Sequence, residues 1–251
     1  KYSPTKTEFK RLSRKGNLIP VVAEIQADLE TPVTAFLKVC RGKHSFLLES
    51  VEQGEKVGRY SFLGTDPKLF LQSRGMRVDC LDERGKRKSC LAGGGPLEVV
   101  REILRPFRFV SFGELPPFCG GLVGFIGYEV VRFFEKIPNR HLDGTPFPDA
   151  ALLLIDHFVI FDHLKRSMKI VALANVRGGV DSAYREASRK IQKVLKLLSR
   201  PLRGEIPLSF HPEMPLKGIT SNTSRRAFEG KVRRAKRYIR RGDVVQVVLS
   251  Q

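Results

Sequence analysis

The apolar residues of this chain follow two different spacings, and the changes between them mark the predicted elements. Short runs rich in β-branched and aromatic residues predict strands at residues 19–25, 45–50, 59–63, 69–73 and 168–173. A longer apolar run at residues 152–163 is sufficient for one or two buried strands. Apolar residues three and four apart predict helices at residues 31–40, 97–107, 181–198 and 225–241.

Polar residues and glycine mark where these helices begin and end. Thr31 is predicted to cap the first helix, with Pro32 at its first position, and Asp181 and Ser224 are predicted caps of later helices. Gly242 fits the position just past the end of the last helix. The apolar side of the first helix is predicted to consist of Val33, Phe36, Leu37 and Cys40.

The chain is predicted to divide near residue 204. Residues 204–218 contain Pro207, Pro212 and Pro215 and show no periodicity, which is typical of a linker. We therefore expect an N-terminal region at 1–203, a linker at 204–218, and the start of a second domain at 219–251. In that last segment a helix is followed at once by a predicted strand at 244–249, so we expect a piece of a longer protein.

Composition narrows the classes of function. With 41% hydrophobic and 28% charged residues, the chain is typical of a globular protein, and no apolar run reaches the length of a membrane span. The four cysteines are scattered, which favours reduced thiols and a cytoplasmic location. The net charge of +19 is spread along the chain, apart from a dense basic run at 225–241. We therefore favour a solvated basic surface over nucleic-acid binding.

Most motifs with possible chemistry have a simpler structural interpretation. The glycine-rich segment 120–129 matches neither the GxGxxG pattern nor the P-loop, which are two phosphate-binding motifs. We therefore interpret its glycines as sites of close packing. The pairs Asp156-His157 and Asp162-His163 suggest a metal site. On one extended strand the two histidines would lie about 20 Å apart, which favours structural roles at strand ends.

The sequence after the strand at 45–50 offers groups that could bind an amino acid. Glu49 and Ser50 present a carboxylate and a hydroxyl, which suit an ammonium group, and Arg59 or Lys56 could meet a carboxylate. The alternative, on these residues alone, is a strand that ends in polar residues and binds nothing.

Several blocks in a fixed order resemble one enzyme family. The chain contains Leu-Leu-Glu-Ser at 47–50, Gly-Arg-Tyr-Ser-Phe at 58–62, and Gly-Asp-Val-Val-Gln-Val-Val-Leu-Ser-Gln at 242–251. Further blocks lie at residues 31–33, 66–67, 120–128, 161–163 and 221–222. Together these blocks resemble the N-terminal portion of the anthranilate synthase component I family of chorismate-utilising enzymes.

This resemblance implies an α+β fold with two orthogonally packed antiparallel β-sheets flanked by helices, present here as its N-terminal part. It implies a lyase of tryptophan biosynthesis that converts chorismate and ammonia to anthranilate and pyruvate, with Mg²⁺ holding the substrate. A glutamine amidotransferase subunit, component II, would supply the ammonia. L-tryptophan would inhibit through a site around Leu48, Glu49 and Ser50, with Ser50 the strongest candidate.

Gln246 distinguishes the ammonia-using enzymes of this family from related enzymes that add water. Relatives that add water carry Lys at the matching position as a base, and a neutral Gln cannot take a proton from water, so ammonia fits better. Aminodeoxychorismate synthase component I and a non-catalytic tryptophan-binding module both remain alternatives. The family's metal-binding glutamates and main catalytic residues lie beyond Gln251, so we expect this chain alone to be inactive. The family usually has acidic residues where helix 225–241 is basic.

Overall fold

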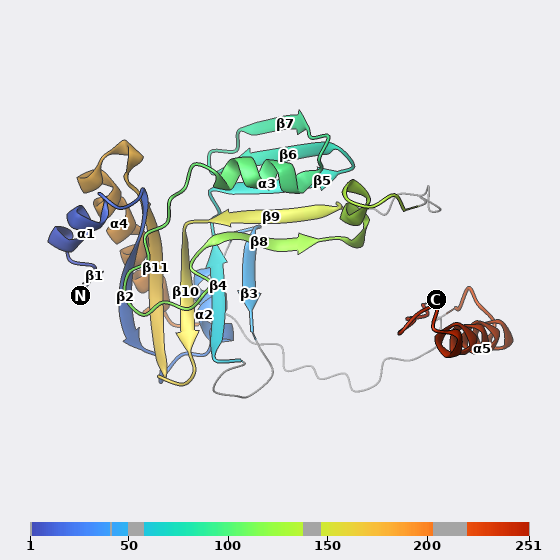
Figure 1. Cartoon of the computed structure of the whole chain (residues 1–251). Helices are drawn as coiled ribbons and strands as arrows, with labels where there is room; N and C mark the ends of the chain where they lie inside the picture. The colour runs from blue at the N-terminus through green and yellow to red at the C-terminus, as the bar shows by residue number, and fades with distance from the viewer. Residues whose placement is uncertain (1, 41, 50–57, 138–146, 203–219, 251) are drawn as a thin grey trace. The chain divides into compact units, whose positions relative to one another are not determined.

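The computed structural model describes residues 2–40, 42–49, 58–137, 147–202 and 220–250 (Figure 1). The chain forms two compact units, Lys1–Arg203 and Gly204–Gln251. The predicted linker at 204–218 lies outside the described residues. Within the described ranges, every helix is too short or too polar to cross a membrane.

The first unit contains a six-stranded antiparallel sheet. Its strands lie in the order β1-β2-β11-β10-β4-β3. Strand β2, from near the start of the first unit, therefore pairs with β11, from near its end. The strands are β1 (Tyr2–Ser3), β2 (Leu18–Gln26), β11 (Ser167–Asn175), β10 (His157–Asp162), β4 (Tyr60–Thr65) and β3 (Ser45–Leu48).

A second antiparallel sheet of five strands runs across the first (Figure 1). Its strands, in order, are β7 (Arg87–Leu91), β6 (Arg77–Asp82), β5 (Leu69–Arg74), β9 (Ala150–Ile155) and β8 (Gly121–Ile126). The chain passes between the sheets twice, from β4 to β5 and from β9 to β10, and only Asp156 separates β9 from β10. The predicted α+β fold with two orthogonal antiparallel sheets is confirmed.

Helices cover the outer faces of both sheets. Residues of α1 (Lys6–Leu12), α2 (Pro32–Val39) and α4 (Val180–Leu198) share one core with the first sheet, and α3 (Pro96–Leu104) packs on the second. Two short 3₁₀ helices, η1 (Tyr128–Phe133) and η2 (Val176–Gly178), connect elements of the first unit. The second unit contains α5 (Arg225–Arg241).

Strand β10 shows why residues 158–161 are all apolar. Phe158 and Ile160 belong to the core between the two sheets, whereas Val159 and Phe161 belong to the core beneath the helices. Because successive side chains of a strand point to opposite faces, a strand covered on both faces needs apolar residues at every position.

Most predicted helix ends are confirmed. The Thr31 hydroxyl accepts a hydrogen bond from the backbone N–H of Thr34 at 3.1 Å, with Pro32 in the first turn of α2. Ser224 caps α5, and Gly242 follows it in the left-handed conformation. The predicted cap at Asp181 is wrong, since Gly179 (φ 112°) occupies the cap position of α4.

Ion pairing explains where the Asp181 side chain lies instead. Its carboxylate forms ion pairs with Lys6 at 3.1 Å and Lys10 at 3.3 Å, which joins α4 to α1. The Asp181 carboxylate is therefore directed toward α1 and does not cap the backbone N–H groups at the start of α4.

The predicted apolar side of α2 is partly wrong. Val33 and Leu37 are about half exposed, whereas Ala35 and Val39 are buried. Phe36 and Cys40 are partly buried against the core, as expected. Helical spacing places two overlapping apolar stripes on this short helix, and packing against β4 and α4 selects the one that contains Ala35.

The strand predicted at 244–249 is absent, and these residues are irregular and, apart from Leu249, exposed. A strand requires a neighbouring strand for its backbone hydrogen bonds, and none among the described residues pairs with this segment.

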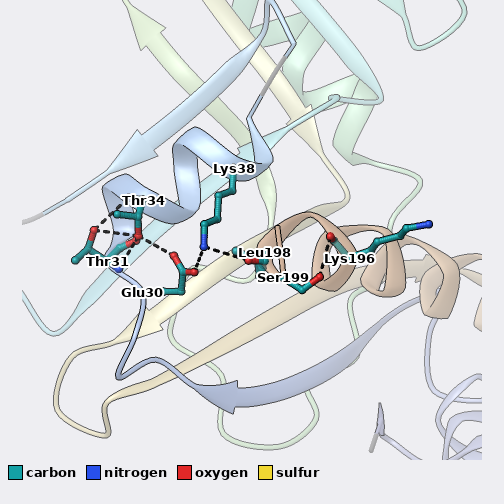
Figure 2. A network of polar contacts seen from close by, with 7 residues as sticks. All are labelled: Glu30, Thr31, Thr34, Lys38, Lys196, Leu198 and Ser199. Atoms are coloured by element: carbon teal, nitrogen blue, oxygen red, sulfur yellow. Dashed lines mark hydrogen bonds and ion pairs between the residues drawn. The ribbon is translucent and has the colours of Figure 1, made fainter. Parts of the chain in front are cut away.

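A polar network ties α2, which leads into β3, to the end of α4 (Figure 2). The Lys38 ammonium is paired with Glu30 and donates to the backbone carbonyl of Leu198 at 3.2 Å. Glu30 also accepts a hydrogen bond from the Thr34 hydroxyl at 2.7 Å. Lys38 therefore supplies a cation to the negative end of α4 and satisfies one of its free carbonyls.

Replacing Lys38 with Met is expected to lower the free energy of unfolding by about 1 to 3 kcal/mol, because it leaves the largely buried Glu30 carboxylate and the Leu198 carbonyl short of a partner. Urea unfolding followed by circular dichroism measures the change. Lys196→Met is the matched control, since Lys196 lies in the same last turn of α4, is exposed and points away from the network. Equal losses in the two variants would show that the network contributes nothing specific.

Candidate functional site

Leu48 and Glu49, two of the predicted effector residues, lie at the end of an edge strand. β3 pairs with β4 from Ser45 opposite Thr65 to Leu48 opposite Phe62. Leu48 is 45% exposed, and Glu49, directly after the strand, is also exposed. Ser50 and Lys56 lie outside the described residues. The structure thus presents an apolar and an acidic side chain together at one accessible position.

The structure does not support the predicted ligand-binding role of Arg59. Its Nε and Nη2 atoms donate to the two carboxylate oxygens of Asp162, at 3.0 and 2.7 Å, and the guanidinium lies 4.9 Å from the centre of the Tyr60 ring. Burial by itself raises the pKa of Asp162, but the hydrogen bonds and charge of Arg59 and the backbone N–H groups of Lys165 and Leu164 together lower that pKa. Arg59 already holds a carboxylate of its own chain.

The two histidines at the ends of β10 have separate structural partners, as predicted. His163 Nε2 lies 2.7 Å from the Ser61 hydroxyl, and His157 Nδ1 lies 2.8 Å from a carboxylate oxygen of Asp156. Across the described ranges, no three His, Cys, Asp or Glu side chains gather closely enough to hold a metal ion.

Asp156, at the corner where β9 becomes β10, is the centre of a buried charge cluster. Besides the contact with His157, its carboxylate lies 2.6 Å from the Lys190 ammonium and 3.5 Å from that of Lys68. Burial alone would raise the pKa of Asp156, but the His157 hydrogen bond and the charge of Lys190 lower it to about 2. In the sequence, Asp156 was interpreted only together with His157, as half of a possible metal site or as a structural pair. Its position between two apolar runs, 152–155 and 158–161, was the feature of the sequence that could have indicated a buried charge.

A cavity of about 560 Å³ opens beside this corner. Its walls come from the start of β2, the turn between β4 and β5, the end of β9, the end of β11 and the segment from the end of α3 to the start of β8. Both Lys68 and Asp156 line it, whereas Leu48 and Glu49 do not. This cavity is not evident from the sequence, because its walls come from five separate parts of the chain.

The close-packing interpretation of the glycine-rich segment agrees with the structure at two positions. A Cβ atom on Gly124 would lie 1.9 Å from the carbonyl oxygen of Ala151 in the neighbouring strand. At Gly120, where φ is +121°, it would lie 2.4 Å from Cδ1 of Leu173. Neither position has room for a side chain.

In the second unit, α5 has no buried residue, and its polar side is strongly basic. Arg225 pairs with Glu229 at 2.9 Å, within the helix. Gln246 lies exposed in the irregular segment after α5.

Comparisons with known proteins identify the family. A model of chorismate binding enzymes matches residues 56–251. Anthranilate synthase component 1 of Synechocystis sp. is 40% identical over 259 residues, which cover 99% of this chain and 51% of the relative. The same protein of Aquifex aeolicus is 37% identical, covering 97% of this chain and 49% of the relative.

A solved structure supports the fold. The crystal structure of anthranilate synthase component I from Streptococcus pneumoniae TIGR4 is 24% identical with a TM-score of 0.53, covering 87% of this chain and 46% of that one. The chain thus spans about half the length of the relatives it matches. Because the family model matches well over half of its residues, this chain belongs to the family of chorismate binding enzymes.

Proposed function

We propose that this chain is part of an anthranilate synthase component I, a lyase that converts chorismate and ammonia to anthranilate and pyruvate. The observation that carries the proposal is the 40% identity to anthranilate synthase component 1 of Synechocystis sp. across 99% of this chain. The presence of Gln246 supports ammonia rather than water as the nucleophile, because a neutral amide cannot act as a base toward water.

The proposal includes two partners of the whole enzyme. A glutamine amidotransferase subunit supplies the ammonia, and Mg²⁺ holds chorismate through residues outside those described here. The reaction also needs a general acid and base, which the resemblance assigns to the part of the enzyme not included in this chain.

Leu48, Glu49 and Ser50 are proposed to bind L-tryptophan as a feedback inhibitor. Glu49 can pair with the ligand's ammonium group, and the half-exposed Leu48 can contact the indole ring. Because Arg59 is held by Asp162, the ligand carboxylate needs another donor. Lys56, the other cation predicted to meet a carboxylate, is the remaining candidate in the sequence.

A chimera tests the catalytic part of the proposal. It joins this chain to the portion of the Synechocystis relative that the match leaves uncovered. With chorismate, ammonium and Mg²⁺ the chimera is expected to release anthranilate, measured by its fluorescence. The Gln246→Lys chimera is the matched variant, and it is expected to lose at least about tenfold in this rate, because a lysine cation replaces a neutral amide beside the nucleophile's position.

The same assay tests the alternatives. Aminodeoxychorismate as the only product would assign the chain to aminodeoxychorismate synthase component I. A folded chimera that binds tryptophan but forms no product from chorismate would favour the non-catalytic module. The anthranilate synthase proposal is favoured because the relatives described above are all anthranilate synthases.

A further inference from the structure

The cavity beside the sheet corner has the size and lining of a small-molecule site. Its volume of about 560 Å³ lies within the usual range for such sites, and its walls are mainly apolar. Phe107, Phe109, Leu115 and Leu154 are among the residues that form these walls.

Glycines at the start of β8 help to form the wall. Gly120 and Gly121 both line the cavity and both have φ near +120°, a conformation that favours glycine. A Cβ atom on Gly121 would meet nothing within 4 Å, in contrast to Gly120, so a side chain there would extend into open space. The absence of side chains thus leaves this part of the wall open.

Charge at the polar end of the cavity indicates which ligand would fit. Asp156 already has His157 at 2.8 Å and Lys190 at 2.6 Å, so its oxygens are occupied. Lys68 is 40% exposed, and its ammonium has one ion pair, at 3.5 Å, and no hydrogen bond with any described residue. The Lys68 ammonium therefore has N–H donors available beside apolar walls. Such a site suits a ligand that carries an anionic group on an apolar body.

We propose that this cavity binds a compact aromatic monocarboxylic acid, with its carboxylate on Lys68 and its ring against Phe107, Phe109 and Leu154. The site is separate from that proposed for tryptophan, since neither Leu48 nor Glu49 lines the cavity. The inference rests on the first unit alone and does not depend on the reaction that the whole protein catalyses.

Paired ligands test the role of the charge in the 251-residue chain. The probes are 2-naphthylacetate and its neutral isostere 2-naphthylacetamide, with affinities measured by isothermal titration calorimetry. The acid is expected to bind at least about tenfold more tightly than the amide, because only the acid can form a charge-assisted hydrogen bond with Lys68. Methyl resonances of Leu154 and Leu173 are expected to shift with the acid, which locates the ligand.

Two variants and a control test the position. Lys68→Met is expected to reduce acid binding to the level of the amide, and Ser111→Trp, at an exposed position of the wall, is expected to block both ligands. Lys165→Met is the control, since Lys165 is 45% exposed with one ion pair and lies outside the cavity. Failure of the acid to bind, equal affinity for acid and amide, or an unchanged affinity in Lys68→Met would each overturn the proposal. Tryptophan binding in the same variants reports on the other site independently.

Discussion

Replacing Lys190 with Met is expected to lower the free energy of unfolding by about 2 to 3 kcal/mol near pH 7, because it leaves a buried carboxylate without its closest cation. Asp156 is 8% exposed, and Lys190 lies 2.6 Å from it. The loss stays below that of a fully isolated buried charge, since His157 and Lys68 remain beside Asp156. Urea unfolding followed by circular dichroism measures it.

The same cluster gives the stability of the chain a specific pH dependence. The pKa of Asp156 is lowered from 3.8 to about 2 in the folded chain. Its stabilising contribution is therefore fully present above about pH 4 and is lost as the pH falls toward 2. The stability advantage of the wild type over Asp156→Asn is expected to shrink by about 2 kcal/mol across this range.

Lys193→Met is the matched control for both measurements. Lys193 lies one turn from Lys190 on α4, and its ion pair with Asp66, at 3.0 Å, has side chains 63% and 49% exposed. An exposed pair of this kind contributes at most about 1 kcal/mol. If Lys193→Met cost as much as Lys190→Met, the burial of Asp156 could not be the cause.

Replacing Glu49 with Gln is expected to weaken L-tryptophan binding by at least about tenfold, because the ligand's ammonium group loses its anionic partner. The chain contains no tryptophan residue, so indole emission in a titration comes from the ligand alone. Ser50→Ala is expected to weaken binding in the same assay, since the hydroxyl is a proposed ligand-binding group.

Glu83→Gln provides the control for the charge change. Glu83 is exposed, lies in the turn between β6 and β7, and belongs to no proposed effector group. This variant is expected to bind tryptophan as the wild type does. Unaltered affinity in Glu49→Gln, or an equal loss in Glu83→Gln, would remove Glu49 from the proposed tryptophan site.

The elements that the sequence predicts well are those whose burial leaves a clear spacing. The β2, β5 and β11 strands and the α4 and α5 helices were all predicted. The hairpin of β6 and β7 was missed because β7 is exposed at every position and therefore carries no apolar alternation. β8 was missed as a definite strand because its glycines weaken the same pattern.

The candidate site was only partly predictable from the sequence. The block containing Leu48 and Glu49 was found by resemblance, and the structure places both at an accessible strand end. The role expected of Arg59 failed, because its partner Asp162 lies about a hundred residues away in the chain and meets it only through the pairing of β4 with β10. No local pattern can show such a contact.

By itself, the sequence determined the caps of α2 and α5, which depend on local spacing. Its ordered motifs also indicated the family by resemblance, and the fold class followed from that resemblance. The tertiary structure alone decided which apolar stripe of α2 is buried, where Asp181 lies and what surrounds Asp156. It also decided that a cavity opens beside Lys68. Each of these depends on segments far apart in the chain being brought within a few ångströms, and packing and charge pairing between them select among arrangements that local sequence leaves equally favourable.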